Sequence, residues 1–295
     1  MFTGSIVALI TPFQNGQVDE LALRNLIRFH LANGTDGIVP CGTTGEAVTL
    51  TRQEWEHVIS VTIDEAKGKI PVIAGTGTND TVKTIEMTRY AQSAGADGAL
   101  IVTPYYNKPT QRGLVAHYTQ IARKVDLPLV VYNVPSRTGG NVLPETMAEL
   151  SQIETIVAVK EASGDLEQIG LISAYCGEQI TILSGDDTLT LPILSVGGKG
   201  VISVVANIVP QDVSDLLAHY NAGRHADALR AFLRLLPLSK AMFIETNPIP
   251  VKTAAAILGL ATDEMRLPLV SMLEEQRVQL TDFLRTYGLL NMASA

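Results

Sequence analysis

Residues 95–104, GADGALIVTP, form an apolar run that glycine opens and proline closes. From Gly98 onward the run has none of the alternation of polar and apolar side chains that marks a strand with one face in water. A continuous apolar run of this length predicts a strand buried on both faces, as in a parallel sheet covered by helices. Residues 34–40, GTDGIVP, nearly copy its beginning, so the chain carries a weak internal repeat.

Runs of this kind recur along the first two thirds of the chain, each followed by a longer helical pattern. Their first positions are 20 to 34 residues apart by subtraction, about the length of one strand plus one helix. Eight such units with right-handed crossovers predict an α/β fold, a (β/α)8 TIM barrel, and a doubly wound open sheet is the competing arrangement. The eight runs are SIVALITP (5–12), GIVPCG (37–42), PVIAGTG (71–77), GALIVTP (98–104), PLVVYNVP (128–135), TIVAVKEAS (155–163), ITILSGDD (180–187) and GVISVVAN (200–207).

The segments between the runs have helical periodicity. In ELALRNLIRFHLANG (20–34) the apolar residues fall on one face of a helix. Thr51 with Glu54 three residues later is a capping box, which predicts the start of the next helix. Gly34 and Gly95 stand where helices would end.

After residue 207 the strand pattern stops and helical patterns continue to the last residues. We therefore expect a catalytic barrel over residues 1–207 and a C-terminal helical extension over residues 208–295. No low-complexity linker separates them. The extension should pack on the barrel and support oligomerisation.

The composition excludes several classes of protein. Of 295 residues, 46% are hydrophobic and 18% are charged, which suits a packed core and not a disordered chain. The net charge of -8, without a block of Lys and Arg, argues against binding of nucleic acid. The first apolar stretch is too short to span a membrane and lacks a basic leader. Two cysteines need no disulfide in a chain of this length, so a cytoplasmic location fits.

The barrel hypothesis selects the candidate catalytic residues, because active sites of barrels form at the carboxyl ends of the strands. Lys160 stands at that end of TIVAVK. Burial there would lower the pKa of its ammonium, and only the neutral amine attacks a ketone to form a Schiff base. The alternative is a lysine paired with a carboxylate. Lys252, in NPIPVK, is the one serious rival among the other lysines and is interpreted as structural.

Tyr132 should lie beside Lys160, because it ends the preceding run and neighbouring strands are about 4.8 Å apart. A phenol there could transfer protons during imine chemistry, and an aromatic residue that covers the core is the alternative. Tyr105 and Tyr106, after the fourth run, could line the same mouth or an interface.

Carboxylate-binding groups follow two other runs. GTTGE (42–46) offers the hydroxyls of Thr43 and Thr44 and consecutive backbone N–H groups, which suit a carboxylate, although an ordinary turn would look similar. Arg137 in PSRTGG could hold a second carboxylate, or it could be a solvated loop residue. Cys41 precedes GTTGE without a histidine at a strand end to activate it, so we expect a small buried residue.

Two observations argue against a metal and against a phosphorylated substrate. All five histidines fall in helical segments, without spacing that would gather them on a metal. The glycine cluster GGKG (197–200) precedes its strand and so lies at the wrong mouth for a barrel phosphate site. We expect no metal and no cofactor.

These motifs together resemble the dihydrodipicolinate synthase family of pyruvate-dependent class I aldolases. The resemblance covers nearly the whole chain and depends on the order of eight motifs: GSIVALITPF, GTTGEAVTL, VTPYYNKPTQ, YNVPSRTG, VAVKEASGD, LSGDD, GVISV and NPIPVK. It implies a Schiff-base-forming synthase that condenses pyruvate with aspartate 4-semialdehyde to give 4-hydroxy-tetrahydrodipicolinate in lysine biosynthesis.

The resemblance also implies roles for individual residues. Lys160 would bind pyruvate covalently, Thr43 and Thr44 its carboxylate, and Arg137 the carboxylate of the second substrate. Thr43, Tyr132 and Tyr106 of the partner subunit would relay protons. The remaining implied features are the pocket positions Gly185 and the carbonyl of Ile202, and a homo-oligomer built as a dimer of dimers.

One departure from the family concerns feedback by lysine. Members that lysine inhibits typically carry an acidic residue at the position of Lys83 and histidines at those of Arg52 and Trp55. The local charge is reversed here, so we expect weak or absent feedback. The roles of Asp186 and Asp187 stay open, with helix capping as one possibility.

Two competing functions differ in chemistry. The first is a sibling lyase that cleaves a sugar keto acid such as N-acetylneuraminate with the same lysine and tyrosine; Arg137 argues against it, because it suits a short aldehyde that carries a carboxylate. The second is a catalytically silent keto-acid-binding barrel, which the complete set of site residues disfavours.

Overall fold

The computed structural model describes residues 2–290 and confirms all eight expected strands as one parallel sheet. Each strand lies within or overlaps its apolar run. The strands are β1 (Gly4–Ala8), β4 (Gly37–Val39), β5 (Ile73–Gly75), β6 (Gly98–Val102), β7 (Leu129–Asn133), β8 (Ile156–Glu161), β9 (Thr181–Ser184) and β10 (Gly200–Ser203).

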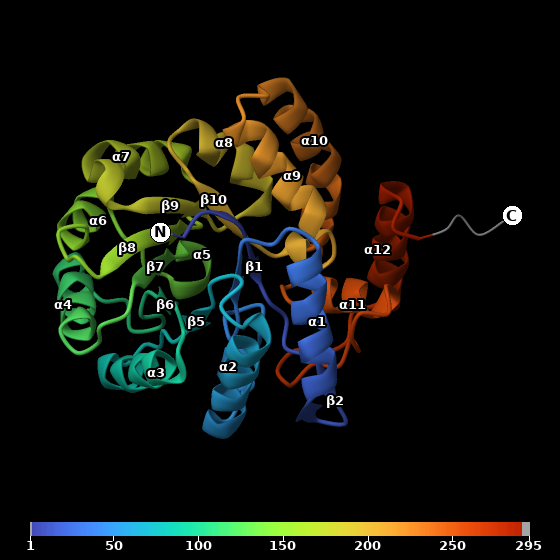
Figure 1. Ribbon diagram of the computed structural model, residues 1–295, viewed down its shortest axis with the longest axis horizontal. Coiled ribbons are helices and arrows are strands. Elements are labelled where there is room, and N and C mark those ends of the chain that lie inside the picture. Colours follow the sequence, from blue (N-terminus) through green and yellow to red (C-terminus); the bar gives the residue numbers. More distant parts are fainter. Residues whose placement is uncertain (1, 291–295) are drawn as a thin grey trace, which may run out of the picture.

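The sheet closes into a barrel (Figure 1). Its strand order is β4-β1-β10-β9-β8-β7-β6-β5, and an isolated parallel bridge between Ile38 and Val72 joins the two outer strands. The expected TIM barrel is therefore confirmed, and the competing open sheet is excluded.

Helices surround the strands in the order that right-handed crossovers require. The expected capping box is present, because the Thr51 side chain accepts from the N–H of Glu54 and the Glu54 side chain accepts from the N–H of Thr51. Gly95 ends its helix in the left-handed region, at φ 93°. The helices are α1 (Glu20–Ala32), α2 (Arg52–Ala66), α3 (Thr81–Ala94), α4 (Gln111–Ala122), α5 (Pro135–Thr138), α6 (Pro144–Leu150), α7 (Leu166–Cys176), α8 (Thr190–Ser195) and α9 (Pro210–Asn221).

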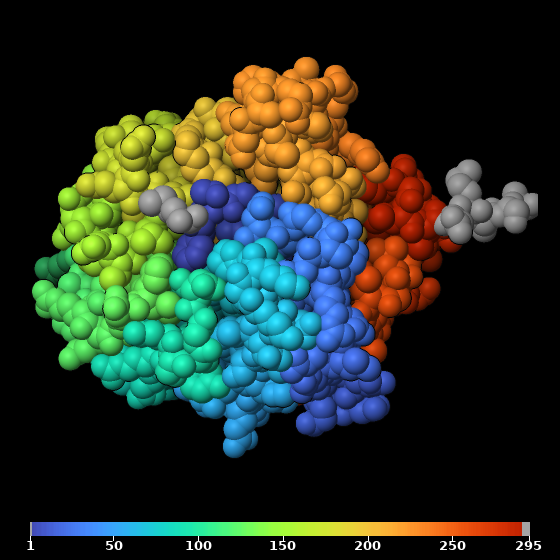
Figure 2. Space-filling model, in the orientation of Figure 1, coloured from blue at the N-terminus to red at the C-terminus, as the bar shows by residue number. Residues whose placement is uncertain are grey.

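Described residues 208–290 of the expected C-terminal extension contain α9, followed by α10 (His225–Ala241), α11 (Ile249–Ile257) and α12 (Glu274–Tyr287). They gather on one side of the ring, and their surface is continuous with that of the barrel (Figure 2). A short hairpin of β2 (Phe13–Gln14) and β3 (Gln17–Val18) also precedes α1, and the apolar pattern did not predict it.

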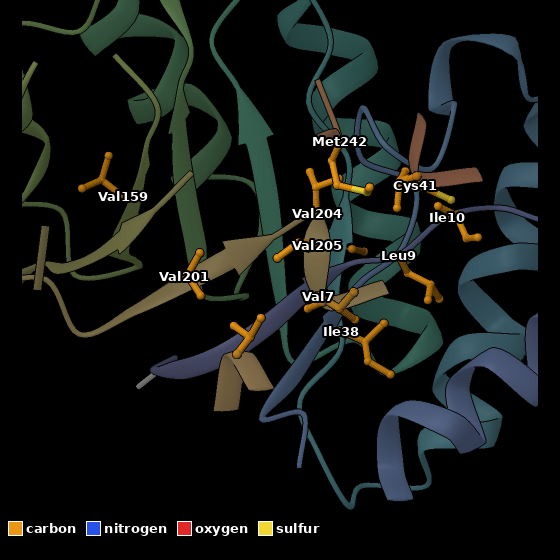
Figure 3. Packing of buried hydrophobic residues seen from close by; sticks show 14 of the residues in the cluster. Val7, Leu9, Ile10, Ile38, Cys41, Val159, Val201, Val204, Val205 and Met242 are labelled. Atoms are coloured by element: carbon orange, nitrogen blue, oxygen red, sulfur yellow. The ribbon is translucent and has the colours of Figure 1, made fainter. Parts of the chain in front are cut away.

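The core has two layers because side chains alternate along each strand. Val7, Ile38 and Val201 belong to the outer layer, which packs against the helices (Figure 3). Residues such as Ile6, Leu183 and Ile202 form a separate inner cluster inside the barrel. Tyr132, which the strand-end argument selects, belongs to this inner cluster, so its side chain faces the interior of the barrel.

Candidate active site

Lys160 lies in β8 one residue before the strand ends, and its Cα pairs in register with those of Tyr132 in β7 and Leu183 in β9. The residue is only 6% exposed. Its side chain lines a cavity of about 230 Å³ at the carboxyl end of the barrel. Within the part of the chain that the structure describes, no carboxylate forms an ion pair with its ammonium, so the alternative of a salt-bridged lysine is not observed.

Burial gives Lys160 the pKa that imine chemistry needs. Desolvation lowers the pKa of Lys160 from its usual value near 10.5 to about 8. The Asp187 carboxylate opposes this shift and the Arg137 guanidinium adds to it. A substantial fraction of the amine is therefore neutral slightly above pH 7, where it can act as a nucleophile.

Tyr132 covers the amine directly. The Lys160 Nζ lies 4.3 Å from the centroid of the Tyr132 ring. Burial raises the pKa of Tyr132, while the charge of Arg137 and the hydroxyl of Thr43 lower it. The phenol therefore stays protonated at neutral pH and can serve as a proton donor beside the nitrogen.

The GTTGE segment forms a tight turn at the cavity. The N–H of Glu46 donates to the carbonyl of Thr43 at 3.1 Å, and the N–H of Ala47 donates to that of Gly42 at 3.3 Å. Thr43 and Thr44 both line the cavity. Their N–H groups donate no hydrogen bond to another described residue, which leaves them for an anionic ligand.

Arg137 also lines the cavity, but in a different setting from the one expected. The segment PSRTGG is not a loop at this point, because Pro135 begins the single helical turn α5 and Gly139 ends it at φ 72°. Arg137 is exposed at the rim, where its Nη2 donates to the carbonyl of Asn247 at 3.3 Å. Its remaining donors are free to meet a carboxylate.

Gly185 lines the cavity, whereas Ile202 does not. A Cβ on Gly185 would lie 2.7 Å from that of Ala162 and 3.2 Å from Cε of Lys160, so only glycine leaves the lysine its space. The Ile202 side chain is 1% exposed and packs in the inner cluster beneath the site.

Tyr106 stands apart from the other candidates. It is 89% exposed, has a φ of 74° and lines neither cavity at the barrel mouth. Its neighbour Tyr105 instead lines a second cavity of about 270 Å³. This second cavity is mostly apolar and has Thr43 and Tyr132 in its wall as well.

Asp187 and Asn247 contribute to the site beyond the residues that the sequence assigns. Asp187 is buried, and its Oδ2 accepts from the N–H groups of Val204 and Val205, both at 2.9 Å. Asn247, between α10 and α11, lines the cavity and donates from Nδ2 to the Thr44 hydroxyl at 3.0 Å. Asp186 caps a 3₁₀ turn by accepting from the N–H of Thr188 at 2.8 Å.

The residues just beyond the catalytic pair form a buried network on the opposite face of the same strands. Asn133 donates from Nδ2 to both oxygens of Glu161, at 3.2 and 3.1 Å, and the N–H of Ser163 donates to Oε1 at 2.7 Å. Glu161 is fully buried among neutral donors. Burial raises the pKa of Glu161, and the hydrogen bonds from Ser163 and Asn133 oppose that rise.

Cys41 and the five histidines lie where the sequence predicts. Cys41 is buried, and desolvation raises the pKa of its thiol, so it is a core residue. All five histidines lie in helices. No set of His, Cys, Asp and Glu side chains within residues 2–290 could hold a metal ion.

The residues on which the prediction of weak feedback by lysine depends lie on α2 and α3. The Arg52 guanidinium lies 5.2 Å from the Trp55 ring centroid, and Trp55 is buried. Lys83 is in the first turn of α3. Weak feedback by lysine stays a prediction.

Comparison with known proteins identifies the family. The family model described as the dihydrodipicolinate synthetase family matches residues 1–287. A 4-hydroxy-tetrahydrodipicolinate synthase of Citrifermentans bemidjiense is 54% identical over 98% of this chain and all of that protein.

Solved structures agree across the same length. The dihydrodipicolinate synthase of Aquifex aeolicus is 50% identical with a TM-score of 0.96, over 98% of this chain and 99% of that chain. The Acinetobacter baumannii enzyme, complexed with pyruvate, is 42% identical with a TM-score of 0.97, over 98% of this chain and 100% of that chain. The chain therefore belongs to the dihydrodipicolinate synthetase family.

Proposed function

We propose that the chain condenses pyruvate with aspartate 4-semialdehyde to give 4-hydroxy-tetrahydrodipicolinate through a Schiff base on Lys160. The observation that carries the proposal is the buried lysine, whose pKa falls to about 8 and which faces a cavity with free backbone N–H groups. Family membership makes the chain a lyase of the class I aldolase type, with a place in lysine and diaminopimelate biosynthesis.

The proposed reaction begins when the neutral amine of Lys160 attacks the ketone of pyruvate and water leaves. The hydroxyls and N–H groups of Thr43 and Thr44 hold the carboxylate of pyruvate. Loss of a proton from the methyl group gives an enamine, whose carbon attacks the aldehyde of the second substrate, and the aldehyde oxygen takes up a proton. The amino group of the second substrate then attacks the imine carbon, which closes the ring and releases the Lys160 amine. Gly185 leaves room for the adduct.

Arg137 binds the carboxylate of aspartate 4-semialdehyde in this proposal. Its position on the rim supports the role, because its guanidinium lines the same cavity as Lys160 and forms no ion pair with a described carboxylate. A planar guanidinium suits a carboxylate geometrically.

Protons move through Thr43, Tyr132 and Tyr106 of the partner subunit. Two observations support a partner's contribution: Tyr106 points away from its own site at 89% exposure, and an apolar cavity opens beside Thr43 and Tyr132. A chain that exchanges this tyrosine with a second copy forms an obligate dimer. We propose that two such dimers associate, supported by the helices of residues 208–295.

We propose that the enzyme works in the cytoplasm. Its two cysteines are free and buried, which suits a reducing compartment. Within residues 2–290, no helix has the length and apolarity that crossing a bilayer requires.

Reductive trapping tests the proposal. Incubation with pyruvate and borohydride, followed by peptide mass mapping, should place a single adduct on Lys160, and an unlabelled Lys160 would refute the aldolase chemistry. Turnover of aspartate 4-semialdehyde in the presence of pyruvate should exceed cleavage of N-acetylneuraminate by orders of magnitude. Labelling without either turnover would instead indicate a silent keto-acid-binding barrel.

The pH dependence of Schiff-base formation should follow the pKa of Lys160. Because the pKa is about 8 and the neutral amine is the nucleophile, the rate should rise about tenfold from pH 6 to 7 and level off above about pH 9. The measurement is the initial rate of trapping by pyruvate and cyanoborohydride between pH 6 and 9.5. A midpoint near that of a solvated lysine would contradict the role of burial.

A further inference from the structure

Residues of the C-terminal extension hold the GTTGE turn in place. Glu46, its last residue, is 2% exposed and has a φ of 52° in the left-handed region. Such a conformation is unfavourable for a residue with a side chain, so neighbouring contacts must maintain it. Those contacts come from two segments more than 200 residues further along the chain.

Lys252 in α11 makes the principal contact. Its Nζ lies 2.6 Å from Oε1 of Glu46, and the side chains are 0% and 1% exposed respectively. The same ammonium donates to the carbonyl of Thr11 at 2.9 Å and lies 4.4 Å from the ring centroid of Phe13. The N–H of Arg266 donates to the other oxygen of Glu46 at 3.1 Å. Both Glu46 carboxylate oxygens are thus fixed.

This pair reaches the carboxylate-binding groups through the backbone. The N–H of Glu46 closes the turn on the carbonyl of Thr43, so the position of Glu46 sets that of Thr43. The hydroxyl of Thr11 donates to the carbonyl of Gly45 at 2.7 Å, and Thr11 is itself held by Lys252. Neither Glu46 nor Lys252 lines the cavity, so they act on a ligand only through the turn.

Stability alone is a poor reason for such a pair. Replacing a buried ion pair by apolar residues of similar volume is often neutral or stabilising. Here the pair instead joins the binding turn to α11, an element of the C-terminal extension.

We propose that Lys252 and Glu46 are positioning residues that hold the GTTGE turn in the form that binds the carboxylate of pyruvate. The inference rests on the proposed function. It gives Lys252 a role in the affinity for pyruvate, whereas Lys160 forms the covalent bond. Loss of the pair should therefore weaken capture of pyruvate more than it slows the later steps, in which Thr43 also relays protons.

The test compares four variants of the full-length protein. Lys252→Met removes the cation, and Glu46→Gln keeps an acceptor for Lys252 without the charge. The double variant Glu46→Gln/Lys252→Met leaves no buried unpaired charge, so it folds even where the single Lys252→Met variant does not. Ile121→Ala makes a cavity in α4, on the side of the ring away from α11 (Figure 1), and controls for a general loss of stability.

Two quantities separate positioning from stability. The first is the pyruvate concentration that gives half-maximal borohydride labelling of Lys160, and the second is kcat at saturating pyruvate. Lys252→Met and the double variant should raise the first about tenfold or more and lower the second by a clearly smaller factor. Glu46→Gln should raise the half-saturating pyruvate concentration less than Lys252→Met or the double variant does. Ile121→Ala should leave this concentration unchanged, although it lowers Tm by a similar amount.

The outcomes are distinguishable from failure of the proposed function. If the unaltered protein is not labelled by pyruvate, the proposed function fails first. If it is labelled and the folded double variant has the same half-saturating pyruvate concentration, the positioning role is wrong. The role is equally wrong if Ile121→Ala weakens pyruvate capture as much as Lys252→Met does.

Discussion

Replacement of Lys160 by methionine should abolish reductive labelling by pyruvate and lower kcat/KM by about three orders of magnitude or more. Methionine has nearly the length of lysine and fits a residue that is 6% exposed, so the barrel should keep its fold and its stability. The Asp187 carboxylate keeps its two backbone donors in this variant. The activity is therefore lost with the nucleophile and not with the structure.

The control for this experiment is Lys69→Met, a change at an exposed lysine beyond α2. It should keep full labelling and turnover. The assignment of Lys160 would be wrong if the Lys160→Met variant were still labelled at another lysine and turned over at the normal rate.

Replacement of Arg137 by leucine should have the second largest effect, and it should act on the second substrate. Removing one partner of a close charged contact costs about 2 to 4 kcal/mol, equivalent to a loss of roughly 30-fold to 1,000-fold in kcat/KM for aspartate 4-semialdehyde. Labelling by pyruvate should persist. Because the charge of Arg137 helps to lower the pKa of Lys160, the pH midpoint of labelling should also move upward.

Steady-state kinetics with the aldehyde as the varied substrate measure the effect, and Arg112→Leu on the exposed face of α4 is the matched control. An Arg137→Leu variant with unchanged kcat/KM for the aldehyde would show that another group receives its carboxylate.

The sequence predicts the barrel and the covalent centre well because both depend on local pattern. Eight apolar runs indicate eight strands, and the strand-end rule selects Lys160 and Tyr132, which indeed pair in register. The same rule could not predict the conformation around Arg137, where proline and glycine enclose a helical turn. The β2–β3 hairpin has strands of only two residues, too short for a periodic signal.

Residues that meet across long sequence separations were the hardest to predict. Asn247 reaches Thr44 over 203 residues, and Lys252 reaches Glu46 over 206 residues. No local pattern encodes such a contact, although NPIPVK is one of the eight motifs on which the family resemblance depends. Lys252 was expected to be structural, and its pairing with Glu46 outside the cavity agrees with that interpretation.

The network formed by Asn133 and Glu161 has a consequence for redesign of the enzyme. Positions 132 and 160 point into the barrel, where a new side chain meets open volume, so new reactive groups can be introduced there one at a time. Positions 133 and 161 share hydrogen bonds inside one buried network, so a change in either removes some of the partners of the other. Laboratory evolution should therefore recover substitutions at these two positions together more often than singly.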